Sequence, residues 1–286
     1  MWAGGKNKML KHYKPLMPSS VKSYCEPFFG GGAMFVYVMN TYAPKYARIN
    51  DINPDIVRIY TSIKTDLVDF TRRLDALESI YIPMSKEDRK KYYYEVRYEH
   101  AYDYETWSPA YEAATLYFLM KTGFNGIFQI NQNTNGRYGT PSGLLNQKDK
   151  VYDRDVLQWW HTALQKTDIH CGDWTDAVEN CPKDTFFFFD PPYRESFADY
   201  GNGFGDKQLT DLISFCDQQS SVMMSNRDDE DWFAKQNHTL NSANFDIFYT
   251  AGRRKKTDEG YDAKKAREIL LYRTTTGLEK FINADN

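Results

Sequence analysis

The chain has 286 residues, with 36 lysines and arginines against 39 aspartates and glutamates, which gives a formal net charge of −3. This length allows one large core, or one core with an inserted domain. The balanced charge excludes a generally basic nucleic-acid binder, so any such role must depend on local patches. The four cysteines form no CxxC pair, so we expect reduced thiols and no metal site. No secretory signal or apolar run near 18 residues is present, which predicts a cytoplasmic protein without a membrane span.

The first part of the chain is predicted to hold a strand, a glycine turn and a helix. A helix-like stretch reaches about Leu16, and a short strand follows over 24–27. Phe28-Phe29-Gly30-Gly31-Gly32 then leads into the apolar run 33–39, an order typical of the first unit of a nucleotide-binding α/β sheet. The glycines let the backbone approach a ligand closely. Because their spacing is not GxGxxG, it favours the amino-acid tail of S-adenosylmethionine over a pyrophosphate.

The second strand is expected over 46–50 and ends at Asp51. This acid lies about 20 residues past the glycines, where such a residue holds ribose hydroxyls.

The α/β rhythm is lost between about 56 and 145. Charged, tyrosine-rich helical sequence covers 86–99, and Ala113, Leu116, Tyr117 and Met120 mark one apolar helix face. The glycine- and asparagine-rich stretch 122–143 is typical of loops and a hairpin. We interpret this block as an inserted domain.

The α/β pattern returns at 168–174. It continues with strands over 185–190 and 221–226 around a helix over 206–218, and two further strands, 245–250 and 268–274, flank a basic linker. The interior strands are continuous apolar runs, which indicates a mostly parallel sheet covered on both faces.

A polar corner, Asp190-Pro191-Pro192-Tyr193, follows the apolar run 186–189. These residue types suit the methylation of an exocyclic amino group of a base. Such an amine is a poor nucleophile because its lone pair is delocalised into the ring. The Asp190 carboxylate and the Pro191 backbone carbonyl can accept its two hydrogens. The prolines stiffen the chain, and the tyrosine offers a face to an unstacked base. A plain strand-end turn is the alternative interpretation.

Two further features are weaker. Gly172-Asp173-Trp174 offers an acceptor beside a large ring, although a buried tryptophan beside a surface aspartate is an equal alternative. Basic side chains gather at the N-terminus and over 253–267. Phosphate neutralisation is one interpretation of these patches, and a solvated surface is the alternative, which we favour for 264–267. The basic residues are Lys6, Lys8, Lys11, Lys14 and Lys22, and then Arg253, Arg254, Lys255, Lys256, Lys264, Lys265 and Arg267.

The order of the motifs carries more information than any one of them. Trp-Ala-Gly-Gly-Lys at 2–6 is followed by the pieces at 26–32, 50–55, 122–127, 172–174, 190–193 and 225–226. This series resembles the Dam/DpnII-type (α-group, D12 class) DNA adenine-N6 methyltransferases. The resemblance implies an α/β fold: a Rossmann-like class I methyltransferase sheet, mostly parallel with one antiparallel strand. It also implies a catalytic domain over 1–55 and 146–286, and an inserted, mainly helical target-recognition domain with a β-hairpin over 56–145.

The same resemblance implies S-adenosylmethionine as the methyl donor and double-stranded DNA as the partner. Catalysis would fall to Asp190, Pro191, Pro192 and Tyr193. The residues implied around the donor are Trp2, Lys6, Phe28, Gly30, Gly32, Asp51, Ile52, Asp173, Trp174 and Asp190. Those implied to contact DNA are Phe124, Asn125, Ile127, Gln129, Asn131, Arg137, Pro141, Arg253 and Arg254.

Gln129 departs from GATC-specific relatives, which usually carry an arginine that reads guanine at this position. Only Met1 precedes Trp2, whereas some relatives have a lysine there. The target is therefore predicted to be adenine in a short specific sequence, without an assignment to GATC.

The expected reaction is direct in-line transfer to a flipped adenine, in a monomer or weak dimer of a bacterial or viral-host cytosol, with or without a restriction partner. No cysteine follows a proline, so the thiol chemistry of cytosine-C5 enzymes is not expected. Alternatives that stay open are a cytosine-N4 or RNA adenine methyltransferase and a catalytically silent DNA-binding relative.

Overall fold

The computed structural model describes residues 9–194, 204–227, 231–249, 256–257, 260–261 and 264–275. The chain folds into two compact units. Of the described residues, 30–33 and 48–174 belong to a helical unit, and the others belong to a strand unit. The two units are defined by how compactly the chain packs and not by function. The boundaries of the catalytic domain (1–55 and 146–286) and of the target-recognition domain (56–145) therefore stay a prediction.

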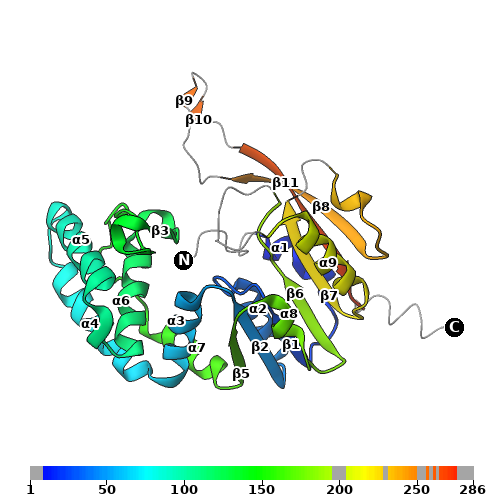
Figure 1. Ribbon diagram of the computed structural model, residues 1–286, viewed down its shortest axis with the longest axis horizontal. Helices are drawn as coiled ribbons and strands as arrows, with labels where there is room; N and C mark the ends of the chain where they lie inside the picture. Colours follow the sequence, from blue (N-terminus) through cyan, green and yellow to red (C-terminus); the bar gives the residue numbers. More distant parts are fainter. Residues whose placement is uncertain are drawn as a thin grey trace. The chain divides into compact units, whose positions relative to one another are not determined.

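A seven-stranded sheet has the order β5-β2-β1-β6-β7-β11-β8 (Figure 1). Strand β1 is parallel to β6 and β6 to β7, whereas β11 is antiparallel to both β7 and β8. Among these five strands only β11 is therefore reversed, and the predicted α/β sheet, mostly parallel with one antiparallel strand, is confirmed. The strands are β1 (Ser23–Glu26), β2 (Tyr46–Asp51), β5 (Thr167–Cys171), β6 (Thr185–Phe189), β7 (Val222–Arg227), β8 (Asn241–Tyr249) and β11 (Lys264–Arg273).

The core of the strand unit is centred on β6, in which all five residues are buried. Their near-continuous aromatic character fits a strand covered on both faces. Helix α9 (Asp206–Asp217) adds an apolar face of Leu209, Leu212 and Ile213 at helical spacing. Besides α9, the helical segments before residue 54 and after residue 173 are α1 (Leu10–Tyr13), η2 (Lys14–Leu16), α2 (Ala33–Tyr42), α8 (Trp174–Val178) and η6 (Phe233–Lys235) in the described part of the chain.

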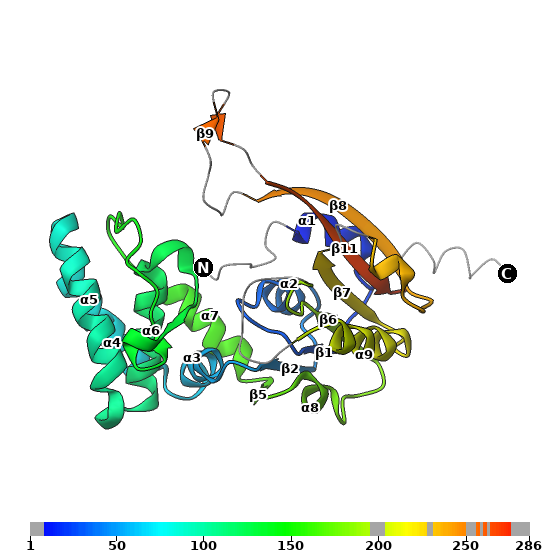
Figure 2. The ribbon, with the colours of Figure 1, turned by 45° about the horizontal axis from the view of Figure 1, so that its top comes forward.

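The helical unit is built around α6 (Pro109–Thr122), which contacts α3 (Pro54–Thr65), α4 (Leu67–Tyr81) and α5 (Lys86–Tyr102). Helices α4, α5 and α6 lie side by side (Figures 1 and 2). Side-chain caps begin these helices: Asn53, Asp66, Ser85 and Ser108 each accept a hydrogen bond from the first turn. Helix α7 (Arg154–Leu164) packs against α3 and α4.

The predicted hairpin of the helical block is present. Strand β3 (Ile130–Asn131) pairs antiparallel with β4 (Arg137–Tyr138), with η5 (Gln132–Thr134) between them. The turn closes through Asn135 and Gly136, whose φ angles of 54° and 70° are left-handed. The short segments η3 (Tyr104–Thr106) and η4 (Phe124–Gly126) lie before and after α6.

The basic linker expected between the last two strands is shorter than predicted. Strand β11 begins at Lys264, where it pairs with Tyr249 of β8, so 264–267 lie in the strand. Antiparallel pairing satisfies the backbone hydrogen bonds of 264–267 whatever their side chains are, so the apolar pattern of the sequence did not mark the start of this strand.

A second small hairpin joins β9 (Lys256–Thr257) and β10 (Gly260–Tyr261). No helix in the described ranges is long and apolar enough to span a membrane.

Candidate active site and recognition hairpin

The glycine turn after β1 is fixed to the end of β2. Gly30 and Gly32 have φ angles of 49° and 62°, a conformation that favours glycine. The N–H of Gly30 donates to Asp51 Oδ2 at 2.8 Å, and the Tyr60 hydroxyl donates to the Gly30 carbonyl at 3.0 Å. Both backbone polar groups of Gly30, its N–H and its carbonyl, are therefore hydrogen-bonded, which fixes the turn.

The carboxyl group of Asp51 is itself partly oriented by the backbone. The N–H of Asn53 donates to Asp51 Oδ1 at 2.9 Å. Burial raises the pKa of Asp51, while the N–H groups of Asn53 and Gly30 act against that rise. Each carboxylate oxygen can accept more than one hydrogen bond, so the group retains capacity for ribose hydroxyls. Ile52 beside it is 42% exposed and offers an apolar contact for a base. A nucleoside-containing ligand such as S-adenosylmethionine fits this set of groups.

The tripeptide Gly172-Asp173-Trp174 follows β5 and is tied to the same corner. Asn50 Nδ2 donates to the Gly172 carbonyl at 3.0 Å, and the Gly172 N–H donates to the Asp51 carbonyl at 3.3 Å. The Asp173 side chain is exposed and Trp174 is buried. The structure thus brings Gly30, Asp51 and Gly172 together, and a direct role of Asp173 and Trp174 toward the donor stays a prediction.

The polar corner Asp190-Pro191-Pro192-Tyr193 follows the buried strand β6 without a break. The Ser225 hydroxyl on β7 donates to Asp190 Oδ1 at 2.9 Å. Asn226 Nδ2 donates to the Pro192 carbonyl at 3.3 Å. The Tyr193 hydroxyl donates to Glu268 Oε1 on β11 at 2.5 Å. Three neighbouring positions of the sheet therefore orient the corner.

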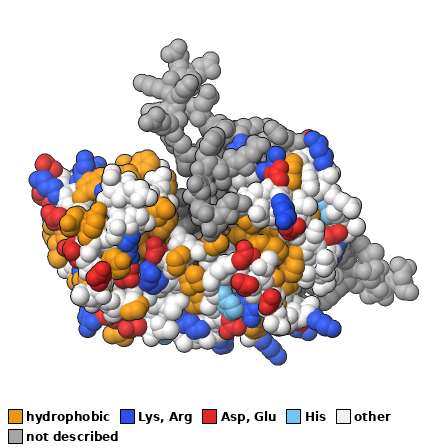
Figure 3. Space-filling view, viewed as in Figure 1, with side chains coloured by type: hydrophobic (Ala, Val, Ile, Leu, Met, Phe, Trp, Pro, Cys, Tyr) orange, Lys and Arg blue, Asp and Glu red, His pale blue; other side chains and the backbone are white. Residues whose placement is uncertain are grey.

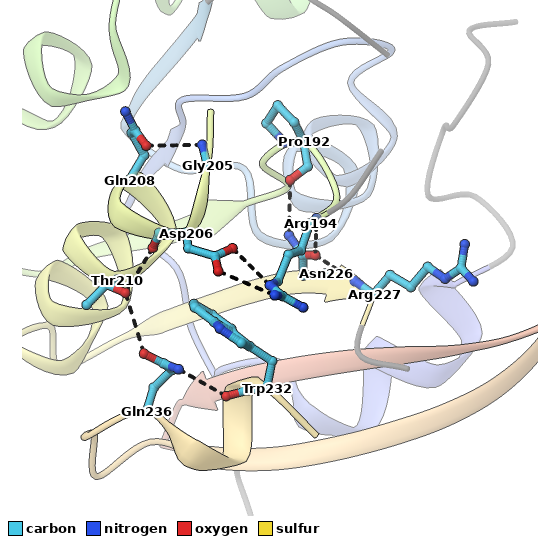
Figure 4. A network of polar contacts seen from close by, with 10 residues as sticks. All are labelled: Pro192, Arg194, Gly205, Asp206, Gln208, Thr210, Asn226, Arg227, Trp232 and Gln236. Carbon is cyan, nitrogen blue, oxygen red and sulfur yellow. Dashed lines mark hydrogen bonds and ion pairs between the residues drawn. The ribbon is translucent and has the colours of Figure 1, made fainter. Parts of the chain in front are cut away.

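The chain leaving this corner is held by a second set of polar contacts (Figure 4). Asn226 Oδ1 accepts the Arg194 N–H at 3.2 Å. The Arg194 guanidinium pairs with Asp206 at 2.9 Å, at the start of α9, and lies 5.2 Å from the Trp232 ring centroid. These contacts fix the direction in which the chain leaves Tyr193.

A buried acid to which the sequence analysis gave no role lies at the end of β1. Glu26 is 3% exposed and accepts a 2.7 Å hydrogen bond from the Tyr24 hydroxyl. Burial raises the pKa of Glu26 well above its ordinary value; the Tyr24 hydrogen bond opposes the rise, and the charge of Asp190 adds to it. The signal in the sequence was its place as the first residue of the motif piece 26–32. Phe28, two residues on, packs its ring against Phe189 and Phe204.

The hairpin β3–β4 with its flanking residues, 124–141, is the region predicted to be the recognition hairpin, and it exposes most of the side chains predicted to contact DNA. Phe124 is 47% exposed, and its N–H donates to the Pro141 carbonyl at 2.9 Å, which places these two residues together at the hairpin base. Ile127 is half-buried, and the exposed members are Phe124, Asn125, Gln129, Asn131 and Pro141. Arg137 differs from the rest, because its side chain is 13% exposed and pairs with Glu112 of α6.

Four of the predicted site residues, Trp2, Lys6, Arg253 and Arg254, lie outside the described residues. On the face drawn in Figure 3, acidic and basic side chains of the described parts are interspersed. Within those parts, no group of three or more histidine, cysteine or acidic side chains is arranged to hold a metal ion.

A mostly parallel sheet with a glycine turn after β1 and a proline-stiffened acidic corner after β6 is consistent with a Rossmann-like methyltransferase fold. The chain belongs to the D12 class N6 adenine-specific DNA methyltransferase family, which it matches over residues 2–274. It is therefore an adenine-specific DNA methyltransferase, and the resemblance inferred from the motif order is confirmed.

Several relatives share most of the chain. The type II methyltransferase M.MjaIII of Methanocaldococcus jannaschii is 30% identical over 249 residues, covering 82% of this chain and 85% of that protein. The type II methyltransferase M.CviBI of Paramecium bursaria Chlorella virus NC1A is 31% identical over 219 residues, 75% of this chain and 76% of that protein. The DNA adenine methylase of Haemophilus influenzae is 26% identical over 239 residues, 79% of this chain and 78% of that protein.

Proposed function

We propose that the protein transfers a methyl group from S-adenosylmethionine to the N6 amine of an adenine that has been flipped out of double-stranded DNA. The observation that carries this proposal is the fixed carboxyl group of Asp190. It follows a fully buried strand, is held by Ser225 at 2.9 Å, and opens a proline pair that ends in Tyr193.

The donor would be held by the glycine turn and the corner around Asp51. Gly30 and Gly32 bring the backbone close to the ligand, Asp51 accepts ribose hydroxyls, and Ile52 packs on the base. When bound, S-adenosylmethionine supplies an electrophilic methyl group on a sulfonium sulfur. The family resemblance adds Trp2, Lys6, Phe28, Asp173 and Trp174 to this site.

The target amine would be oriented by two acceptors, the Asp190 carboxylate and the Pro191 carbonyl. Asn226 already donates to the carbonyl of Pro192, whereas no described residue donates to that of Pro191. Drawing the two amine hydrogens to fixed acceptors concentrates the nitrogen lone pair for attack. The nitrogen would attack the methyl carbon directly while the carbon–sulfur bond of the donor breaks, so no covalent enzyme intermediate is required. The methylated nitrogen then loses its extra proton to solvent.

Positioning of this kind can contribute roughly 7–11 kcal/mol in well-aligned systems. Extruding the base costs a few kcal/mol, and stacking on the Tyr193 ring offsets about 1–3 kcal/mol of that cost. The rest of the DNA affinity would come from the hairpin and from basic residues, among them Arg253 and Arg254.

Recognition would use the exposed hairpin. Phe124 would fill or prop the gap left by the flipped base, and Ile127 and Pro141 would contact a thymine methyl group. Gln129 suits an adenine edge better than a guanine, so we do not assign GATC. Such an enzyme acts where the DNA is, in the cytoplasm of a bacterium or of a virus's host.

The test is substitution of the acid. Asp190→Ala should abolish transfer of labelled methyl groups to DNA, as measured by nucleoside mass analysis, while DNA binding by fluorescence anisotropy stays within about twofold of wild type. Asp211→Ala, an exposed acid on α9, is the matched control and should keep full activity. Near-normal turnover of Asp190→Ala would refute the proposal.

A further inference from the structure

Glu112 bridges two arginines in the middle of the helical unit. One oxygen, Oε1, accepts from Arg137 on β4 of the hairpin and from Arg58 on α3, the latter at 3.2 Å. The Glu112 and Arg137 side chains are only 12% and 13% exposed. A carboxylate shared by two guanidinium groups at this burial is a stronger link than a surface ion pair.

An aromatic contact, in addition to the ion pair with Glu112, holds the Arg137 side chain inward. Its guanidinium lies 3.5 Å from the Tyr104 ring centroid. Its Nη1 atom is buried and has no hydrogen-bond partner within the described residues. Leaving this donor unpaired has a free-energy cost, so the inward position must be maintained by Glu112 and the tyrosine ring together. A side chain held this way anchors β4 and is poorly placed to reach a phosphate.

The second arginine continues the network toward the Asp51 corner. Arg58 Nη1 also donates to Asp55 Oδ1 at 2.6 Å. Asp55 is in the first turn of α3, and its N–H donates to the Asn53 side chain at 3.0 Å. The N–H of Asn53 in turn donates to Asp51 Oδ1 at 2.9 Å. Short polar contacts therefore connect the hairpin with the carboxylate proposed to hold the donor ribose.

We infer that Glu112 is a positioning residue that couples the recognition hairpin to the donor-binding corner. It acts through Arg137 on one side and through Arg58 on the other, and it touches neither DNA nor donor. Donor binding at Asp51 would then reduce the motion of the hairpin backbone. Without Glu112, donor binding would no longer affect the hairpin. The inference rests on the proposed function, because it takes Asp51 as a donor ligand and the hairpin as the DNA reader.

Hydrogen–deuterium exchange of the 286-residue chain tests this coupling without DNA. Saturating S-adenosylmethionine should slow exchange of the hairpin amides at 129–140 severalfold in wild type. Glu112→Gln should abolish that slowing, and Glu95→Gln, which removes an exposed acid of α5, should keep it. Unchanged hairpin exchange in wild type, or a full donor effect in Glu112→Gln, would overturn the inference.

DNA binding at several salt concentrations separates an anchor from a phosphate contact. If Arg137 is an anchor, Arg137→Gln, Glu112→Gln and the double variant weaken binding by a similar factor, on the order of tenfold, with the salt slope unchanged. If Arg137 instead contacts a phosphate, Arg137→Gln alone lowers the slope by about one, and the anchor role is excluded.

Calorimetry with S-adenosylmethionine distinguishes failure of the proposed function from failure of the coupling. Absence of donor binding to wild-type protein would sink the proposed function itself. Tight donor binding without any change at the hairpin would leave that function intact and refute only the coupling through Glu112.

Discussion

The hydroxyl of Tyr193 donates a 2.5 Å hydrogen bond to Glu268, a residue 75 positions later in the chain. Glu268 is fully buried on β11, where it is in register with Arg227 of β7 and Phe245 of β8. The reversed strand of the sheet therefore orients the Tyr193 ring, which ends the polar corner Asp190-Pro191-Pro192-Tyr193. In the proposed reaction we expect Glu268 to act through this ring and not by contact with the adenine.

This bond predicts a graded response at Tyr193. Tyr193→Phe keeps the ring and loses only the hydrogen bond, so kcat/KM should fall a few-fold, equivalent to about 0.5–1.5 kcal/mol. Tyr193→Ala removes the stacking face as well and should cost about 1–3 kcal/mol more. Steady-state methylation of a duplex measures both. Equal losses in the two variants would mean that the ring does not stack on the base.

A second prediction concerns the serine beneath the acid. Ser225 is fully buried, and its hydroxyl holds Asp190 Oδ1. Ser225→Ala leaves the carboxyl group in place but lets it rotate, so kcat should fall about tenfold while the KM for S-adenosylmethionine stays constant. Ser214→Ala, an exposed serine of α9, is the control. If kcat is unchanged while the melting temperature falls, Ser225 is only structural.

The elements that the sequence predicted are those whose signal is local. Apolar runs marked β6 and β7, and the glycine turn between β1 and α2 needs no distant partner to be recognised. The groups that orient the corner could not be found in this way. Ser225 and Asn226 belonged to the motif series but had no assigned role. Glu268 was predicted only as the first residue of a strand, and nothing in the sequence indicated that it contacts Tyr193.

Charge pairing was equally invisible in the sequence. The family resemblance implied that Arg137 contacts DNA. Its pairing with Glu112 depends on how α6 packs beside the hairpin, which no spacing rule encodes. Likewise the burial of Glu26, which ends β1 beside the Tyr24 hydroxyl, depends on what packs around that strand.

Asp51 supplies a third prediction. Its carboxylate accepts the N–H groups of Gly30 and Asn53, and an asparagine can replace only one of these oxygens. Asp51→Asn should therefore weaken S-adenosylmethionine binding about tenfold or more, since hydrogen bonds to a charged group contribute about 1.5–3 kcal/mol. Calorimetry gives the Kd, with Asp168→Asn, an exposed acid of β5, as control. An unchanged Kd in Asp51→Asn would remove this residue from the donor site.

The last prediction concerns stability and pH. His100 on α5 is fully buried, and neither ring nitrogen has a hydrogen-bond partner among the described residues. Burial lowers the pKa of His100 to about 3, and the charges of Arg137 and Arg58 contribute to this decrease. Between about pH 6.5 and pH 3 the unfolded chain binds a proton at this position that the folded chain does not.

The free energy of unfolding should therefore decrease as the pH falls below about 6.5, by up to about 1.4 kcal/mol per pH unit from this group. His100→Leu and His100→Gln both remove the titration and should flatten the decrease between pH 6.5 and pH 5, as measured by urea unfolding. The two variants differ at pH 7.5, where leucine avoids the unpaired polar atoms that glutamine retains and should be the more stable. A wild-type slope in both variants would show that His100 is not the residue that titrates.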